Sequence, residues 1–323
     1  MDKIFKIKTK KEFNILCIDI FHHQYKNNKI YHNFVDELKI DVNKIKEYTE
    51  IPFLPINFFK THIIKSTEDE AQKIFLSSST TGLNQSKHYI NDIEVYNKSF
   101  LETFRIFYGE PADYCILALL PSYLEREGSS LIFMMDRLIK ESKNSKSGFY
   151  LNEHKKLAET LESLKKEKQK IFLLGVSFGL LDFIENYTVK IPDAIVMETG
   201  GMKGRRNEMI RDELHFLLKK SFGVKTIHSE YGMTELLSQA YSFGNGIFNT
   251  PPWMKILIRD INDPLCLIDK NKTGGINIID LANYNSCSFI ATQDLGKIND
   301  DNSFEIIGRF DNSDIRGCNL LIS

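Results

Sequence analysis

The run Ile171-Phe172-Leu173-Leu174-Gly175-Val176 is apolar throughout and opens directly into an apolar segment with helical spacing. Similar runs, bounded by Gly, Pro or Ser, occur at 74–76, 114–120 and 194–197, with amphipathic stretches between them. Continuous apolar runs separated by helical segments are typical of a mostly parallel sheet that is buried on both faces. The sequence therefore predicts an α/β protein with a mostly parallel sheet at its core.

The amino-acid composition and hydrophobic pattern of the chain change twice along its length. Residues 1–70 are rich in Lys and Asn and predict a helical segment that packs on the core. Residues 71–250 hold the apolar runs of the α/β core, and residues 251–323 contain short strand-like pieces separated by turns. We expect the last region to form a β-rich subdomain.

Composition excludes several classes of protein. The chain has 323 residues, 42% of them hydrophobic and 26% charged, and a net charge of −1, as in an ordinary globular protein. A near-neutral chain has no positive field with which to hold nucleic acid by charge. No stretch approaches the roughly 18 apolar residues of a membrane span, and no export signal is readable. We expect a cytoplasmic protein.

The five cysteines are widely spaced and include no CxxC pair. We expect them to be reduced thiols rather than disulfides or metal ligands. Four of them lie in or beside apolar runs and predict core positions: Cys17, Cys115, Cys266 and Cys287.

A cluster of hydroxyl residues follows the first apolar run and ends in a glycine: Ser77, Ser78, Ser79, Thr80, Thr81 and Gly82. Small side chains let backbone N–H groups turn inward, hydroxyls donate, and Gly tolerates a positive φ, so such a loop can wrap an anion. Clusters of this kind are also common in plain loops, and the Walker spacing GxxxxGK[ST] is absent. The loop is thus a candidate phosphate site.

Two further segments carry groups suited to a nucleotide. In Tyr231-Gly232-Met233-Thr234-Glu235, the ring can pack on a base, the hydroxyl can reach a phosphate, and the carboxylate can hold Mg²⁺. Farther along, Asp294 can accept hydrogen bonds from both hydroxyls of a ribose, and Arg309 can reach the same sugar. The order of these segments, more than any one of them, indicates a nucleotide site.

These motifs resemble those of the adenylate-forming superfamily, which includes acyl-CoA synthetases, luciferase and adenylation domains. Residues 77–82 are similar to its phosphate loop, Gly200 and Gly201 to its adenine-contacting turn, and 231–235 to its signature segment. The resemblance places Asp294 and Arg309 on the ribose and covers roughly residues 70–318. Ser79 departs from a common Gly, and Lys87 lies farther from Gly82 than the usual Lys.

Within that superfamily the chain is most similar to the acyl-protein synthetase (LuxE) family, through segments such as 51–60, 120–130, 279–283 and 315–320. The resemblance implies that a fatty acid is activated by ATP and Mg²⁺ as acyl-AMP and then passed to a cysteine of the enzyme, which points to Cys318. It also implies that an acyl reductase or carrier protein receives the acyl group. An ionised thiol near Arg316 would suit this role.

Most superfamily members continue for about a hundred residues beyond this point and carry a Lys that stabilises the adenylation transition state, so we expect the usual C-terminal domain to be missing here. Three residues are candidates for the cation that would replace that Lys, and the sequence does not rank them: Lys87, Lys203 and Arg205.

Two alternatives compete with this interpretation. Gly175-Val176-Ser177-Phe178-Gly179 fits the G-x-S-x-G nucleophile elbow, and would make the protein an α/β-hydrolase or acyltransferase that uses Ser177. The triad order needs a His far downstream, but His215 and His228 are the last histidines. The other alternative is a non-catalytic homologue that binds a nucleotide, although Glu235, Asp294 and Arg309 are all retained.

Overall fold

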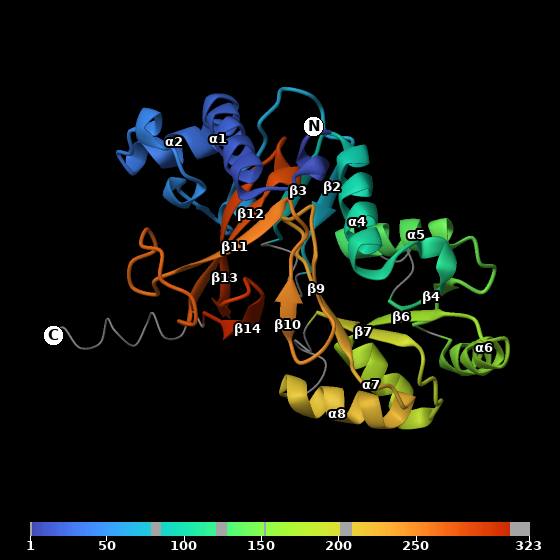
Figure 1. Ribbon diagram of the computed structural model, residues 1–323. Helices are drawn as coiled ribbons and strands as arrows, with labels where there is room; N and C mark the ends of the chain where they lie inside the picture. The colour runs from blue at the N-terminus through green and yellow to red at the C-terminus, as the bar shows by residue number, and fades with distance from the viewer. Residues whose placement is uncertain (1, 79–84, 121–127, 152, 201–208, 311–323) are drawn as a thin grey trace. The chain divides into compact units, whose positions relative to one another are not determined.

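The computed structural model describes residues 2–78, 85–120, 128–151, 153–200 and 209–310. The chain divides into two compact units (Figure 1). An α/β unit is formed by residues 70–251, and a β-rich unit is formed by residues 2–69 together with the chain from 252 onward. Within the described ranges, no helix combines the length and apolar character that crossing a membrane requires.

The α/β unit is built on a mostly parallel sheet, as predicted. Its strand order is β10-β9-β8-β7-β6-β4-β5, in which the pairs from β8 to β5 are parallel and those of β9 and β10 are antiparallel. The strands are β4 Cys115–Leu119, β5 Gly148–Phe149, β6 Ile171–Val176, β7 Ile195–Thr199, β8 His228–Tyr231, β9 Ala240–Ser242 and β10 Ile247–Asn249. Three of the predicted apolar runs thus form its neighbouring central strands β4, β6 and β7.

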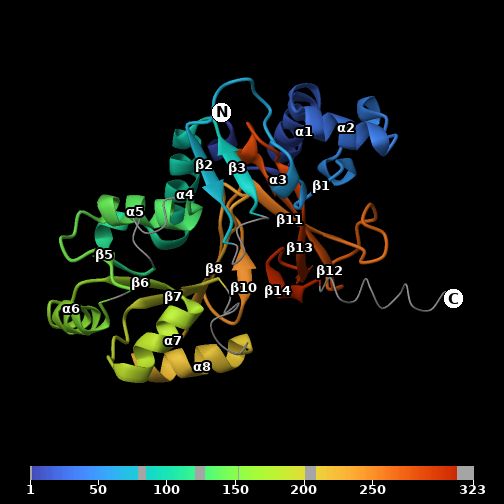
Figure 2. The ribbon, with the colours of Figure 1, turned by 180° about the vertical axis from the view of Figure 1, so that it is seen from behind.

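Helices cover both faces of this sheet (Figures 1 and 2). On one face, Leu117 of β4 and Leu173 of β6 pack in a buried cluster with apolar side chains of α6, α7 and α8. On the other face, Phe172 of β6 meets Phe104 of α4 with ring centroids 5.1 Å apart. The helices are α4 Ile93–Tyr108, α5 Ser130–Ser142, α6 His154–Lys166, α7 Ser177–Asn186 and α8 Arg211–Phe222, with a 3₁₀ turn at Pro111–Asp113.

A separate antiparallel hairpin precedes α4. It consists of β2 Lys73–Leu76 and β3 Lys87–Ile90, with Leu76 opposite Lys87. The apolar run 74–76 was expected in the parallel sheet, and that expectation is wrong, because its partner is the next strand along the chain. The Asp92 side chain then accepts the Glu94 N–H at 3.0 Å and begins α4.

The β-rich unit contains an antiparallel sheet of the order β11-β12-β13-β14. Its strands are β11 Met254–Arg259, β12 Gly274–Asp280, β13 Phe289–Ile298 and β14 Phe304–Arg309, and a 3₁₀ turn follows β12 at Leu281–Asn283. These elements contain the strand-like pieces that the sequence indicates after residue 250.

The N-terminal residues belong to this same unit. Besides α1 Lys10–Asn27, α2 Lys29–Glu37 and α3 Phe58–Thr61, they form the strand β1 Leu54–Pro55, which pairs in parallel with β13 through Leu54 and Ile290. Short 3₁₀ turns lie at Ile4–Lys6, Val42–Lys44 and Tyr48–Glu50. Buried Gln24 of α1 donates to the carbonyl oxygens of Asn283 and Tyr284, both at 3.0 Å. Helices and a strand from the start of the chain thus complete a sheet made by its end.

Candidate active site

The Ser/Thr-rich loop is carried by the β2–β3 hairpin. The Ser77 N–H donates to the Ser86 carbonyl at 3.1 Å, and the Ser86 N–H donates to the Ser77 hydroxyl oxygen at 2.9 Å. Ser77 therefore closes the base of the loop, and a hydroxyl that accepts one bond can still donate its proton. Ser78 is exposed, whereas Ser79, Thr80, Thr81 and Gly82 lie outside the described residues.

A buried histidine connects this hairpin to the segment 231–235. His88 of β3 is fully buried, and its Nδ1 lies 2.8 Å from the carbonyl oxygen of Thr234. Because a carbonyl can only accept, Nδ1 must carry the proton. Burial lowers the pKa of His88 to about 4, so the ring is neutral at physiological pH. The sequence analysis missed His88, whose one signal was a histidine in the strand just after the loop.

The segment 231–235 leaves the end of β8 as a turn. Tyr231 is the last residue of the strand, is buried, and packs edge-on against Phe248 at 6.1 Å between ring centroids. A Cβ at Gly232 would collide with Oε1 of Glu230, so only glycine fits there without displacement. Glu235 is 5% exposed. The segment therefore carries a buried aromatic ring and a buried acid a few residues apart.

The predicted adenine turn follows the neighbouring strand. Thr199 ends β7 and Glu230 is its partner in the parallel β7–β8 register. The Thr199 hydroxyl donates to Oε2 of Glu230. Gly200 comes next with a φ of +71° and open space where a Cβ would lie, so its backbone conformation is what favours glycine. Gly201 lies outside the described residues.

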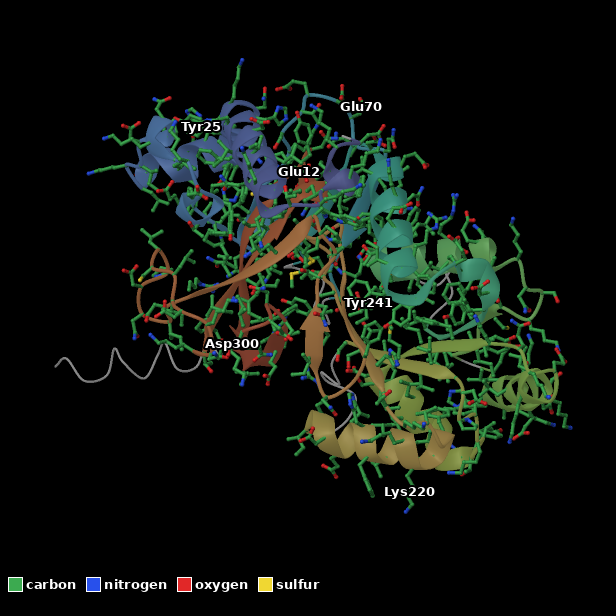
Figure 3. The ribbon with its side chains drawn as sticks, in the orientation of Figure 1. Glu12, Tyr25, Glu70, Lys220, Tyr241 and Asp300 are labelled. Atoms are coloured by element: carbon green, nitrogen blue, oxygen red, sulfur yellow. The ribbon has the colours of Figure 1, made fainter. Side chains whose placement is uncertain are left out.

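Glu230 is an unusual acid in this setting. Desolvation raises its pKa to about 7, with a further upward contribution from the charge of Glu198, while the hydrogen bond from Thr199 opposes the rise. Tyr241, which is labelled in Figure 3, is its partner across the β8–β9 pair. Thr199 and Glu230 thus bring the ends of β7 and β8 together at the edge where open α/β sheets bind ligands.

The elbow-like motif around Ser177 does not form a triad. Ser177 is the first residue of α7, is buried, and has no positive φ, whereas a nucleophile elbow needs a strained turn that exposes the hydroxyl. Its hydroxyl donates to the Gly200 carbonyl at 2.8 Å and lies 3.2 Å from Oε2 of Glu198. His215 meets the other oxygen of Glu198 at 3.6 Å.

The acid therefore stands between the serine and the histidine, whereas a hydrolytic triad places the histidine in the middle. Nearby, a Cβ at Gly175 would lie 2.8 Å from Cγ of Leu180 and 2.9 Å from Cβ of Leu119. Gly175 therefore allows β6 and α7 to pack closely. Because Ser177 is buried and the acid lies between it and His215, the serine-hydrolase alternative is wrong.

In the β-rich unit, the two predicted ribose ligands face each other across β13 and β14. Asp294 and Arg309 are directly opposed in the register, and Nε of Arg309 lies 2.7 Å from Oδ1 of Asp294. Asp294 is buried, while the Arg309 side chain is 57% exposed. The pair presents a fixed carboxylate with an arginine at its side.

A second arginine, which the sequence analysis missed, lies in the same unit. Buried Arg259 donates to the carbonyl oxygen of Thr292 at 2.5 Å and to Oδ1 of Asn277 at 2.8 Å. Desolvation lowers its pKa, and the charge of Asp294 opposes that change. Its carbonyl partners identify Arg259 as a group that holds neighbouring strands together.

The cysteines fall into three groups. Cys318 lies outside the described residues. Cys17, Cys115 and Cys287 are buried as predicted, and desolvation raises the pKa of each thiol, that of Cys287 to about 12. Cys266 was expected in the core, but it is exposed on the loop between β11 and β12.

The candidate cations are only partly placed. Lys87 is exposed at the start of β3, while Lys203 and Arg205 lie outside the described residues. No group of three or more His, Cys, Asp or Glu side chains that could hold a metal occurs in the described ranges. A single carboxylate such as Glu235 nevertheless suits Mg²⁺, which proteins commonly bind through one or two carboxylates plus substrate phosphates.

Comparison with protein families finds a match in the N-terminal part of the chain. Residues 5–99 match the family model described as acyl-protein synthetase, LuxE. A long-chain-fatty-acid–luciferin-component ligase from Photorhabdus luminescens is 39% identical over 69 residues, which make up 21% of this chain and 59% of that protein. The match thus spans less than two thirds of this relative.

Solved structures are similar over far more of the chain. The ATP-bound MatB from Rhodopseudomonas palustris has a TM-score of 0.53 and 14% identity, over 73% of this chain and 47% of MatB. A 2-hydroxyisobutyryl-CoA ligase with 2-HIB-AMP and CoA has a TM-score of 0.66 and 11% identity, over 94% of this chain and 70% of the ligase. The chain is therefore similar in sequence to the LuxE acyl-protein synthetases over residues 5–99, and its fold is similar to those of MatB and the 2-hydroxyisobutyryl-CoA ligase.

Proposed function

We propose that the protein activates a carboxylic acid with ATP as an acyl-adenylate and then transfers the acyl group to a protein cysteine. The observation that carries the proposal is the hydrogen bond from His88 to the Thr234 carbonyl, which joins two motifs 146 residues apart. Through it, the hairpin of the Ser/Thr-rich loop is fixed to the segment that holds Thr234 and Glu235. Phosphoryl transfer needs such fixed groups, because positioning and charge neutralisation supply most of its catalysis.

Each unit has its own part in this proposal. In the α/β unit, residues 77–82 hold the β- and γ-phosphates, Thr234 contacts the α-phosphate, and the adenine lies beside Tyr231-Gly232 and Gly200-Gly201. In the β-rich unit, Asp294 accepts the ribose hydroxyls and Arg309 holds the Asp294 carboxylate in place, as their 2.7 Å contact supports. Glu235 is the residue we assign to Mg²⁺, which when bound neutralises charge on the phosphates.

The chemistry proceeds in two balanced steps. A carboxylate oxygen of the substrate attacks the α-phosphorus of ATP, the bond to the bridging oxygen breaks, and pyrophosphate leaves. A cysteine thiolate then attacks the carbonyl carbon of the mixed anhydride, and AMP departs with the electron pair. We assign the thiolate to Cys318, to which the resemblance to the LuxE family points. Among the described thiols, Cys17, Cys115 and Cys287 are buried with raised pKa values, and Cys266 is exposed.

We propose a long-chain fatty acid as the substrate and an acyl reductase or carrier protein as the partner that takes the acyl group from the cysteine. The name of the Photorhabdus luminescens relative, a long-chain-fatty-acid–luciferin-component ligase, supports the choice of acid.

Acid-dependent exchange of pyrophosphate into ATP tests the first step. We expect exchange with fatty acids of some chain length, and none when the acid or Mg²⁺ is omitted. A protein that binds ATP without exchanging pyrophosphate for any acid of a graded series would instead be a non-catalytic nucleotide-binding homologue.

Radiolabelled fatty acid with ATP tests the second step. We expect hydroxylamine-sensitive label on the protein, lost in Cys318→Ser and retained in Cys266→Ser. The second variant is the matched control, because Cys266 is the exposed thiol among the described cysteines. Label that persists in Cys318→Ser but disappears in Cys266→Ser would transfer the acceptor role to Cys266 and leave the adenylation step intact.

A further inference from the structure

The bond between His88 and Thr234 fixes a single peptide group. The carbonyl that His88 contacts belongs to the peptide that joins Thr234 to Glu235, and this peptide is planar. Because the group is planar, holding its oxygen also restricts the direction of the Glu235 N–H and the position of the Glu235 Cα. Under the proposed function, these two residues meet the α-phosphate and Mg²⁺.

The ring of His88 is itself held by its surroundings. His88 lies directly opposite Phe75 in the β2–β3 register, and both side chains are fully buried. Phe75 packs edge-on against Tyr96 of α4 and Phe133 of α5, with centroid separations of 5.4 and 5.6 Å. A histidine whose strand partner is packed in this way presents its Nδ1–H in a defined direction.

A second bond joins the same two parts of the α/β unit farther along. The hydroxyl of Ser99 on α4 lies 3.0 Å from that of Ser238, and both residues are buried. The segment 233–238 is thus held at two points by the elements that follow the Ser/Thr-rich loop. Of these two bonds, the one from His88 acts on the peptide that precedes Glu235, so the Ser99 bond can serve as the control.

We infer that His88 is a positioning residue, which sets the Thr234–Glu235 peptide for the metal and the α-phosphate through the Nδ1–H bond to the Thr234 carbonyl. The catalytic part of this inference rests on the proposed function. His88 would touch neither ATP nor the acid, and its effect would reach the reaction through Glu235.

Two amide variants separate the bond from the bulk of the side chain. In His88→Asn the amide nitrogen lies close to the position of Nδ1, whereas in His88→Gln it lies close to the position of Nε2. Both place a neutral amide in the same buried site, so their cost in desolvation is similar. Ser99→Ala breaks the other bond and serves as the control for a general loosening of the segment.

Hydrogen–deuterium exchange of peptides covering residues 231–238 tests the positioning without requiring activity. We expect the exchange rate at these amides to rise by about tenfold in His88→Gln, which loses the bond, and to stay near that of the wild type in His88→Asn. Equal protection of this segment in both variants would overturn the inference.

Pyrophosphate–ATP exchange at varied Mg²⁺ then tests the consequence. In His88→Gln we expect the Mg²⁺ concentration for half-maximal rate to rise by about tenfold and kcat to fall by about 10- to 100-fold, with recovery in His88→Asn. Ser99→Ala should leave the Mg²⁺ dependence within twofold.

The outcomes separate the inference from the proposed function. An unchanged Mg²⁺ dependence in His88→Gln, in the presence of faster amide exchange, would overturn the catalytic part of the inference. A wild-type protein with no pyrophosphate exchange would instead refute the proposed function, and the deuterium measurement would still decide whether His88 holds the peptide.

Discussion

Two carboxyl groups, a partly buried one in the α/β unit and a buried one in the β-rich unit, are held in contrasting ways. Glu230 at the end of β8 has a threonine hydroxyl and a second glutamate as neighbours, and its pKa rises to about 7. Asp294 on β13 has Arg309 at 2.7 Å and the charge of Arg259 nearby. Desolvation moves Glu230 toward its neutral form, whereas Asp294 forms an ion pair with Arg309. Glu230 is suited to the hydrogen bond with Thr199 that joins β7 and β8, and Asp294 is suited to binding the hydroxyls of a sugar.

The largest effect is expected from removing the paired acid. Asp294→Ala takes away the proposed ribose ligand and leaves buried Arg259 without the compensating charge of Asp294. We expect the rate of pyrophosphate exchange to fall by about 100-fold and the unfolding free energy to fall by about 3 kcal/mol. Denaturant melts with exchange assays measure both quantities.

Arg309→Ala is the matched control for that change. Its side chain is 57% exposed, and exposed ion pairs contribute less than about 1 kcal/mol. Equal losses of stability in Asp294→Ala and Arg309→Ala would show that the Asp294–Arg309 pair, and not the burial of Asp294 near Arg259, sets the cost.

Gly232→Ala tests how tightly Glu230 is enclosed. The new Cβ would collide with Oε1 of Glu230, so we expect a loss of about 2 kcal/mol of unfolding free energy. In a Glu230→Ala background the same change should cost less than about 1 kcal/mol, because the obstructing oxygen is gone. Additive losses in the double variant would mean that Glu230 is not what excludes a side chain at 232.

The pH dependence of stability tests the protonation of Glu230. Its pKa is raised from an ordinary 4.5 to about 7 by folding, so the proton is bound more tightly in the folded state. The stability from this group is fully present below pH 4.5 and is lost as pH rises through about 7. Relative to Glu230→Gln, which does not titrate, the wild type should lose on the order of 2 kcal/mol over that range. A difference that stays flat between pH 4 and 8 would rule out the raised pKa.

The smallest effect is expected at Ser177. Ser177→Ala removes a buried hydroxyl that donates to the Gly200 carbonyl, and should cost about 1 kcal/mol of unfolding free energy. Pyrophosphate exchange should persist at a rate within a few-fold of the wild type. A complete loss of acyl transfer in a folded Ser177→Ala protein would instead support the hypothesis that Ser177 is a nucleophile.

Some features could be predicted because they depend on local patterns. The apolar runs 114–120, 171–176 and 194–197 predict the buried strands β4, β6 and β7, since a strand covered on both faces must be apolar throughout. The run 74–76 has the same character, but its partner is the alternating segment 87–90, which the loop separates from it. Sequence alone did not distinguish a strand of the parallel sheet from a strand of a separate antiparallel hairpin.

Other features depend on contacts that no local pattern carries. The acceptor of His88 lies 146 residues away, so its role could not be read from its neighbours in sequence. The elbow motif at Ser177 is the ordinary appearance of a close strand-to-helix connection, and only the hydrogen bonds to Glu198 and Gly200 distinguish it from a nucleophile. Cys266 lies among apolar residues, yet Asp260 accepts backbone N–H bonds from Asn262 and Asp263 and bends that segment into an exposed loop.

The pairing of Leu54 with Ile290 has a consequence for how the protein is made. Residues 70–251 form one continuous stretch, whereas the β-rich unit takes its residues from both sides of that stretch. The first helices emerge earlier but must wait for β13 to be synthesised before their apolar faces are covered. The β-rich unit can thus be completed only after the whole of the α/β unit has been synthesised.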